Sequence, residues 1–144
     1  RGILNFFGDI WTFIRDVVII NKDANYNSVY LLKKGVNHSD ITIDNIQDKC
    51  YFIGDQANTD NFITEFDFRF GPYFVPNKVG TNKKADYNWI RGNNGQDTDK
   101  AVCVLLLGGR AFGGSEAGSG HFNPSWIQSV SSTHVGFFTT VKLD

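Results

Sequence analysis

Residues 105–118 read LLLGGRAFGGSEAG, and they divide the chain into two kinds of sequence. The apolar run 101–107 ends abruptly at Gly108-Gly109, and the residues that follow are glycine-rich and polar. A short apolar run bounded by polar residues is typical of a strand that is buried on both faces. Glycines permit the tight turns that irregular loops need. The stretch therefore predicts a core strand that leads into a long surface loop, 108–133.

A second strand is predicted over 62–70, FITEFDFRF, because its residue types alternate. Four phenylalanines share one parity and three charged residues share the other: Phe62, Phe66, Phe68 and Phe70 against Glu65, Asp67 and Arg69. This alternation indicates a half-buried strand with one wet face. We expect it to end at Gly71-Pro72, because proline cannot donate to a strand ladder.

Other segments predict a hairpin, a terminal strand and a long loop. The apolar runs DVVIIN and SVYLLKK flank the polar segment 21–27, which is the pattern of a hairpin. Near the end of the chain, HVGFFTTVK alternates and predicts a strand over 134–142. Residues 71–100 are rich in Gly, Asn, Lys and Asp, and we expect a long functional loop there.

Composition limits the class of protein and its partners. With 144 residues, the chain is long enough for one domain, 1–144, with a hydrophobic core. Because 41% of the residues are hydrophobic and 15% aromatic, we expect a folded chain. The net charge of −1 gives no basic surface for nucleic acid. No apolar run approaches the ~20 residues of a membrane span, so we expect no membrane insertion.

The residues that usually carry chemistry do not form a recognisable site. Gly113 and Gly118 have the spacing of a phosphate-binding loop, but Ser119 stands where that loop requires lysine. The histidines, His38, His121 and His134, lie in separate segments and are interpreted as surface residues. We therefore predict no enzyme activity, no metal and no cofactor.

The two cysteines, Cys50 and Cys103, are expected to stay reduced. Cys103 lies inside the apolar run AVCVLLL, where a free cysteine behaves as a small hydrophobe. Two cysteines without a CxxC pair also make a zinc site a poor interpretation.

Two motifs at opposite ends of the chain resemble one family. The opening, RGILNFFGDIWTFI, is similar to the "RGIEN-aromatic-aromatic-GNIW-x-W" motif of C-type-lectin-like domains of the formylglycine-generating-enzyme type. Such domains also occur in the variable proteins of diversity-generating retroelements and in phage virion proteins. The end of the chain resembles the C-terminal pattern of the same family. The matching positions are Gly108-Gly109, Gly114, Ala117-Gly118, Asn123, Ser129, Ser131, Thr133, Val135-Gly136 and Phe137.

The resemblance implies an α+β, C-type-lectin-like fold: a small twisted antiparallel sheet with long irregular loops and few helices. It implies that the opening motif and the last strand lie close together, with Trp11 largely buried. Enzymes of the family carry reactive cysteines near the C-terminal end, and this chain has none there. Formylglycine formation is therefore not expected.

By the same resemblance, the chain is expected to be a binding module of a phage virion protein, either a fibre or a capsid decoration. We expect the C-terminal segment of a longer protein, assembled in the bacterial cytoplasm and exposed on the virion as a homo-oligomer through the parent protein. Its partner would be a host-surface or mucosal glycan or protein; the alternative is a structural domain that contacts neighbouring virion subunits. The predicted ligand-binding residues are Arg110, Phe112, Glu116, His121, Ser125, Trp126, Gln128, Ser132 and His134. Phe112 and Trp126 have a second interpretation, as fillers of a small core beneath the loop.

Overall fold

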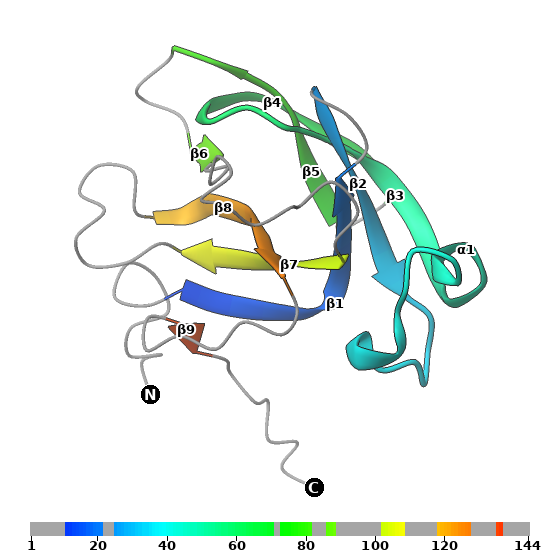
Figure 1. Ribbon diagram of the computed structural model, residues 1–144. Helices are drawn as coiled ribbons and strands as arrows, with labels where there is room; N and C mark the ends of the chain where they lie inside the picture. The colour runs from blue at the N-terminus through cyan, green and yellow to red at the C-terminus, as the bar shows by residue number, and fades with distance from the viewer. Residues whose placement is uncertain are drawn as a thin grey trace, which may run out of the picture.

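The computed structural model describes residues 11–21, 25–70, 73–81, 86–88, 102–108, 118–127 and 135–136. These residues form one sheet of nine strands with almost no helix (Figure 1). The strands are β1 Trp11–Asn21, β2 Tyr26–Leu32, β3 Cys50–Ala57, β4 Asn61–Phe70, β5 Tyr73–Gly80, β6 Tyr87–Asn88, β7 Val102–Gly108, β8 Gly118–Ile127 and β9 Val135–Gly136. A 3-10 turn, His38–Asp40, and the short helix α1, Ile46–Lys49, lie between β2 and β3.

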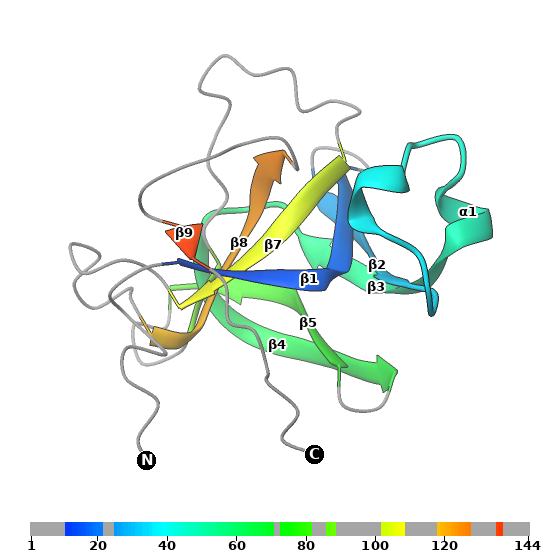
Figure 2. The same cartoon turned by 90° about the horizontal axis from the view of Figure 1, so that it is seen from below.

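The sheet curves into a barrel that is nearly closed. The strand order is β3-β2-β1-β7-β8-β6-β4-β5, and β9 pairs in parallel with β1 outside this path. The two end strands, β3 and β5, pack against each other (Figures 1 and 2). Gly54 on β3 marks this seam: a side chain built there would lie 3.5 Å from the Val75 side chain on β5. That distance is an ordinary van der Waals contact, so glycine is favoured here by its φ of +158°, which other residues rarely adopt, and not by lack of space.

The expected α+β, C-type-lectin-like fold is therefore wrong, because the described residues form a mostly β, barrel-like sheet. Two segments that were expected to be loops contribute strands to it. Part of 71–100 forms β5 and β6, and part of 108–133 forms β8. The physical reason is hydrogen bonding to a neighbouring strand, which local sequence does not reveal. β5 pairs antiparallel with β4, and β8 pairs antiparallel with β7.

Several sequence predictions are confirmed. The hairpin joins β1 to β2 in antiparallel register, with Val18 opposite Tyr30. β7 is buried on both faces: Cys103 and Leu105 face the interior, while Val104 and Leu106 are also buried. β4 ends at Phe70, directly before Gly71-Pro72.

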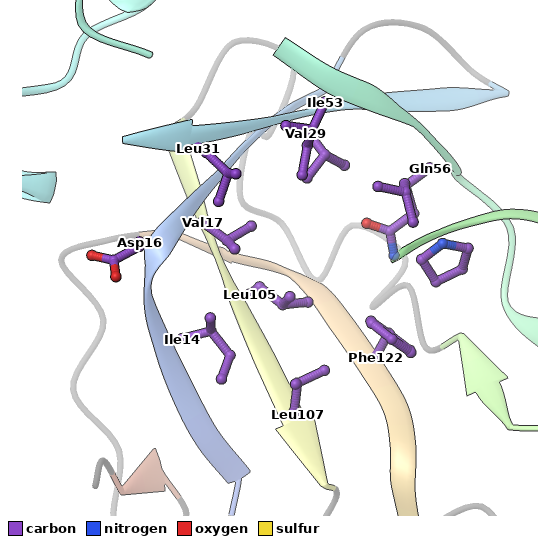
Figure 3. A pocket seen from close by; sticks show the side chains of 12 residues that line it. Ile14, Asp16, Val17, Val29, Leu31, Ile53, Gln56, Leu105, Leu107 and Phe122 are labelled. Carbon is purple, nitrogen blue, oxygen red and sulfur yellow. The ribbon is translucent and has the colours of Figure 1, made fainter. Parts of the chain in front are cut away.

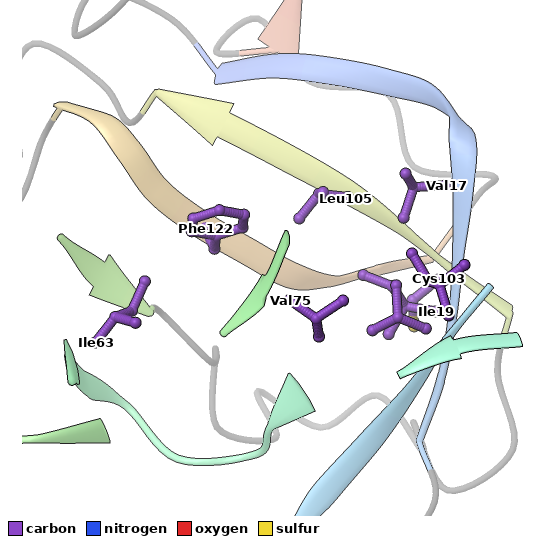
Figure 4. Packing of buried hydrophobic residues seen from close by; sticks show 9 residues of the cluster. Val17, Ile19, Ile63, Val75, Cys103, Leu105 and Phe122 are labelled. Carbon is purple, nitrogen blue, oxygen red and sulfur yellow. The ribbon is translucent and has the colours of Figure 1, made fainter. Parts of the chain in front are cut away.

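The main core lies in the interior of the barrel (Figure 4). Its buried members are Val17, Ile19, Val29, Ile53, Ile63, Val75, Cys103, Leu105 and Phe122. They come from seven different strands, so the interior side chains connect strands that share no ladder. Alternation of inward and outward side chains along each strand explains why period-2 segments supply this core.

A second, smaller core covers the outer face of β1, β2 and β3. Val18, Tyr30 and Cys50 pack there against Ile41 and Ile46, which belong to the segment around α1. This cover explains why DVVIIN is a continuous apolar run: Val17 and Ile19 face inward, whereas Val18 faces the outer cluster.

The alternation predicted along β4 is interrupted. Register irregularities lie between Ile63 and Glu65 and again between Glu65 and Phe66. As a result, Ile63 and Phe66 both contact the interior core although their parities differ. Phe68 is 63% exposed, so the prediction that all the phenylalanines share the buried face is wrong.

Candidate functional site

The nine predicted ligand-binding residues fall into two groups. The side chains of His121, Ser125 and Trp126 lie outside the described part of the protein, but their backbone belongs to β8. The other six lie outside the described residues altogether: Arg110, Phe112, Glu116, Gln128, Ser132 and His134. Their role in binding stays a prediction.

The described strand ends nevertheless show where the predicted binding segment is attached. Gly108 at the end of β7 pairs with Gly118 at the start of β8, and Gly108 has a φ of +98° that favours glycine. Leu107 pairs with Thr12 on β1. Residues 109–117 therefore begin and end at neighbouring positions on one end of the sheet.

A described segment near each end of the chain lies at the same end of the sheet. Trp11 pairs with Val135, and Thr12 pairs with Gly136, in the parallel ladder between β1 and β9. This pairing confirms that the opening motif lies beside the last predicted strand, although residues 137–142 are outside the described part. The burial of Trp11 is not tested, because its side chain is outside it as well.

The backbone of Trp126 belongs to β8. Its backbone pairs with Val104, in the half of β7 that is farther from Gly108. β8 lies between β7 and β6 and is not an end strand. The expectation of one continuous loop over 108–133 is thus wrong for 118–127, which form β8.

Among the described residues we find no cluster of side chains typical of a metal site, and the Cys103 thiol and His38 are both buried. No group of three or more His, Cys, Asp or Glu residues there has the arrangement of a metal site. Burial raises the pKa of the Cys103 thiol to about 11, so this thiol is a poor nucleophile. His38 is only 8% exposed, which corrects its interpretation as a surface histidine.

The cysteines are free and lie in different cores. Cys103 faces the barrel interior and Cys50 belongs to the outer cluster. Burial also raises the pKa of Cys50, while Lys33 and Lys49 act in the opposite direction. The prediction that Cys103 faces the core is confirmed.

An apolar cavity of about 210 Å³, partly open to solvent, lies within the barrel (Figure 3). Strands from around the barrel line it with apolar side chains, among them Val17, Val29, Leu105 and Phe122. Two polar residues contribute to the lining: Gln56 from β3, and Asp16, which is exposed on β1. An apolar cavity with few polar groups is the usual form of a small-molecule site.

Gln56 is held in the barrel by a buried hydrogen bond. Only 1% of the residue is exposed, and its Nε2 donates to Asn88 Oδ1 over 2.7 Å. Asn88 Nδ2 in turn donates to the backbone oxygens of Ala57 and Thr59, over 2.8 and 3.0 Å. These bonds fix the orientation of both amides, because each amide has a defined donor and acceptor end.

The sequence did not single out Gln56, and a β-bulge explains why. Val29 pairs with Gly54 but Tyr30 pairs with Phe52, so Ile53 is an extra residue in β3. Phe52 and Gln56 have the same parity, yet Phe52 is exposed and Gln56 lines the cavity. Period-2 reasoning assigns both to one face and carries no signal for a bulge at Ile53.

Comparison with known proteins adds no relatives. No family model matches the chain, and neither a curated protein nor a solved structure matches it significantly. Among the described residues, none of the helices has the length and apolar character needed to cross a membrane.

Proposed function

We propose that this chain is a non-enzymatic binding module of a virion protein, a fibre or a capsid decoration, that recognises a host-surface or mucosal carbohydrate or protein. The virion setting rests on the resemblance of the two terminal motifs. The observation that supports the proposal is the pairing of Trp11 with Val135 beside the ladder that joins Gly108 to Gly118. It brings Trp11 and Thr12 of the opening motif beside Val135 and Gly136 of the C-terminal pattern.

This arrangement suits recognition for a physical reason. Binding residues are commonly carried on segments that a rigid scaffold holds at both ends. The paired positions of Gly108 and Gly118 supply such ends for residues 109–117. That segment contains Arg110, Phe112 and Glu116. Arginine and glutamate form charged hydrogen bonds, and an aromatic ring supplies contact area.

The proposal assigns different roles to Phe112 and Trp126. Phe112 belongs to the segment between the paired glycines, and we expect it to contact the partner. Trp126 occupies a paired strand position opposite Val104, which is buried. We therefore expect Trp126 to contribute chiefly to stability, in agreement with the interpretation of it as a core filler.

A binding experiment with matched variants tests the proposal. Labelled protein would be applied to a glycan array and to a panel of bacterial cells. Phe112→Ala should weaken the binding by about 2 kcal/mol and leave the melting temperature unchanged, as truncation of an interface anchor does. Trp126→Ala should lower the melting temperature, and the exposed Lys34→Ala should change neither quantity. Native-like binding by Phe112→Ala would contradict the assignment of the site.

The structural alternative, contact with neighbouring virion subunits, is favoured by one observation. Large aromatic side chains are exposed on the barrel surface: Phe68 is 63% exposed and Tyr51 60%. Exposed aromatics are common in protein–protein contacts. If subunit contact is the function, the protein should self-associate in analytical ultracentrifugation, Phe68→Ser should weaken that association, and binding to cells and glycans should be absent.

A further inference from the structure

We propose that the cavity inside the barrel is a binding site for a small, mainly apolar molecule that carries one neutral hydroxyl group. The cavity is a different feature from the strand end at Gly108 and Gly118. The inference does not rest on the virion setting, so its failure would leave the proposed function untouched.

The size and lining of the cavity set the apolar part of the ligand. The cavity has a volume of about 210 Å³, and a ligand seated in it would gain van der Waals contacts with the side chains that line it. An apolar cavity of about 150 Å³ is large enough to accept benzene. Val29, Val75, Leu105 and Phe122 present only hydrocarbon to the space, which therefore fits one ring with a few further atoms.

The hydrogen-bond network sets the polar part of the ligand. Asn88 Nδ2 is committed to the oxygens of Ala57 and Thr59, which leaves Asn88 Oδ1 as an acceptor. Gln56 must then present Nε2 to Asn88, and it does so over 2.7 Å. The other end of the Gln56 amide is its oxygen, which Figure 3 shows turned toward the apolar lining. The network thus presents an acceptor to the cavity.

An acceptor in apolar surroundings selects for a donor. A polar group that loses water on burial needs a hydrogen-bond partner, and a ligand hydroxyl supplies one to Gln56. A carboxylate would place another acceptor against the Gln56 oxygen and would have to lose its own hydration. Asp16 at the edge of the cavity is also negatively charged, so it repels a ligand that carries a carboxylate. Neutral alcohols and phenols are therefore favoured over acids.

Three probes of similar size test this specificity in the whole chain: phenol, toluene and benzoate. Each would be titrated while the methyl resonances of the cavity side chains are followed by NMR. One net hydrogen bond predicts that phenol binds about 2- to 10-fold more tightly than toluene, which is its counterpart without the hydroxyl. Benzoate should produce no saturable shift. Equal affinity for phenol and toluene, or tight binding of benzoate, would overturn the proposal.

Two variants and one control locate the binding. Gln56→Leu should abolish the preference for phenol over toluene, whereas Gln47→Leu, the same change at an exposed position, should keep it. Val29→Phe fills part of the cavity and should abolish the binding of both compounds. Phenol binding that survives Val29→Phe would place it elsewhere and contradict the proposal.

The native protein supplies a test that does not depend on the folding of variants. Phenol should shift the side-chain carbonyl carbon of Gln56, and toluene should not. Phenol should also give intermolecular NOEs to the methyl groups of Val75 and Leu105, which both line the cavity. If neither signal is present at saturating phenol, the proposal is wrong.

Discussion

Gln56 on β3 and Asn88 on β6 form a buried side-chain hydrogen bond of 2.7 Å between two strands that share no ladder. β3 is one end of the sheet, whereas β6 lies between β8 and β4. Asn61 at the start of β4 pairs with Asn88, so the bond joins the end of β3 to β6 beside the connection between β3 and β4. It fixes the position of β6 against the end of β3, and it orients Gln56, the buried polar side chain of the described cavity lining.

The first prediction concerns this network. Asn88→Ala would leave the Gln56 donor and the oxygens of Ala57 and Thr59 without their partner. An unsatisfied buried polar group costs about 1–3 kcal/mol, so the free energy of unfolding should fall by at least this amount. Urea denaturation measures the change. Asn37→Ala, at an exposed position, is the control and should stay within about 0.5 kcal/mol of the native protein.

A second prediction tests the interior core with one type of substitution at two positions. Ile19 is 1% exposed and belongs to the interior cluster, whereas Ile43 is 39% exposed. Ile19→Ala should lower the free energy of unfolding by about 2–5 kcal/mol, because it removes buried methyl groups and leaves a cavity. Ile43→Ala should cost far less. Similar losses for the two variants would show that Ile19 is not in a packed core.

The cysteines provide a third prediction. Burial raises the pKa of Cys103 to about 11, and it also raises that of Cys50. Since the thiolate is the reactive form, both thiols should react slowly with Ellman's reagent in the native protein at mildly alkaline pH. Two thiols should react rapidly once the chain is unfolded without reductant. Rapid labelling of Cys103 in the native state would contradict its position in the interior.

The same shift has a consequence at high pH. The native pKa of Cys103 lies above the unfolded value of about 9, so the thiol stays protonated longer in the folded chain. The contribution of the protonated Cys103 thiol to the free energy of unfolding is fully present below about pH 9. It is lost as the pH rises toward 11. Cys103→Ala should reduce the loss of stability across this range.

A fourth prediction concerns acid. The hydrogen bond from Lys78, 2.6 Å long, lowers the pKa of Glu65, and the Arg69 side chain lowers that of Asp67. The pKa of each carboxyl is lower in the folded chain than in the unfolded chain. The ionised carboxylate therefore stabilises the fold above the ordinary carboxyl pKa, and this stabilisation is lost as the pH falls through the pKa of the folded chain. The urea midpoint should therefore decrease below about pH 4.5. Because these groups are near the surface, salt should weaken the effect.

Lys78→Gln supplies the control for this pH dependence. It removes the charged partner of Glu65 and leaves the pair of Asp67 with Arg69 intact. The acid-induced decrease should become smaller, and the difference from the native protein should disappear at high ionic strength. An unchanged pH profile would show that the Glu65–Lys78 pair does not contribute in solution.

Local sequence patterns predicted individual strands well. Residues 103–106 are buried on both faces of β7, and a continuous apolar run is typical of a strand in that environment. The hairpin of β1 and β2 follows from two apolar runs around a polar turn. Both features depend on residues close together in sequence.

The overall fold and the cavity could not be obtained in this way. Barrel closure depends on the packing of β3 against β5, and Gly54 at this seam is one of many glycines in the sequence. The inward position of Gln56 depends on the extra residue at Ile53, which leaves no periodic signal. The prediction of a long loop over 71–100 was wrong for a related reason. The Gly- and Asn-rich residues after Pro72 are typical of a loop, but their pairing with β4 makes them a strand.

The sheet closes through β3 and β5, and both the cavity and the position of Gln56 depend on this closure. A NOESY spectrum of isotopically labelled protein tests it directly at the seam. The closed barrel predicts a strong cross-peak between the Gly54 α-protons and a γ-methyl group of Val75, since a side chain at Gly54 would lie 3.5 Å from that methyl. Absence of this cross-peak, with the β4–β5 and β2–β3 ladders intact, would show an open sheet and contradict the account.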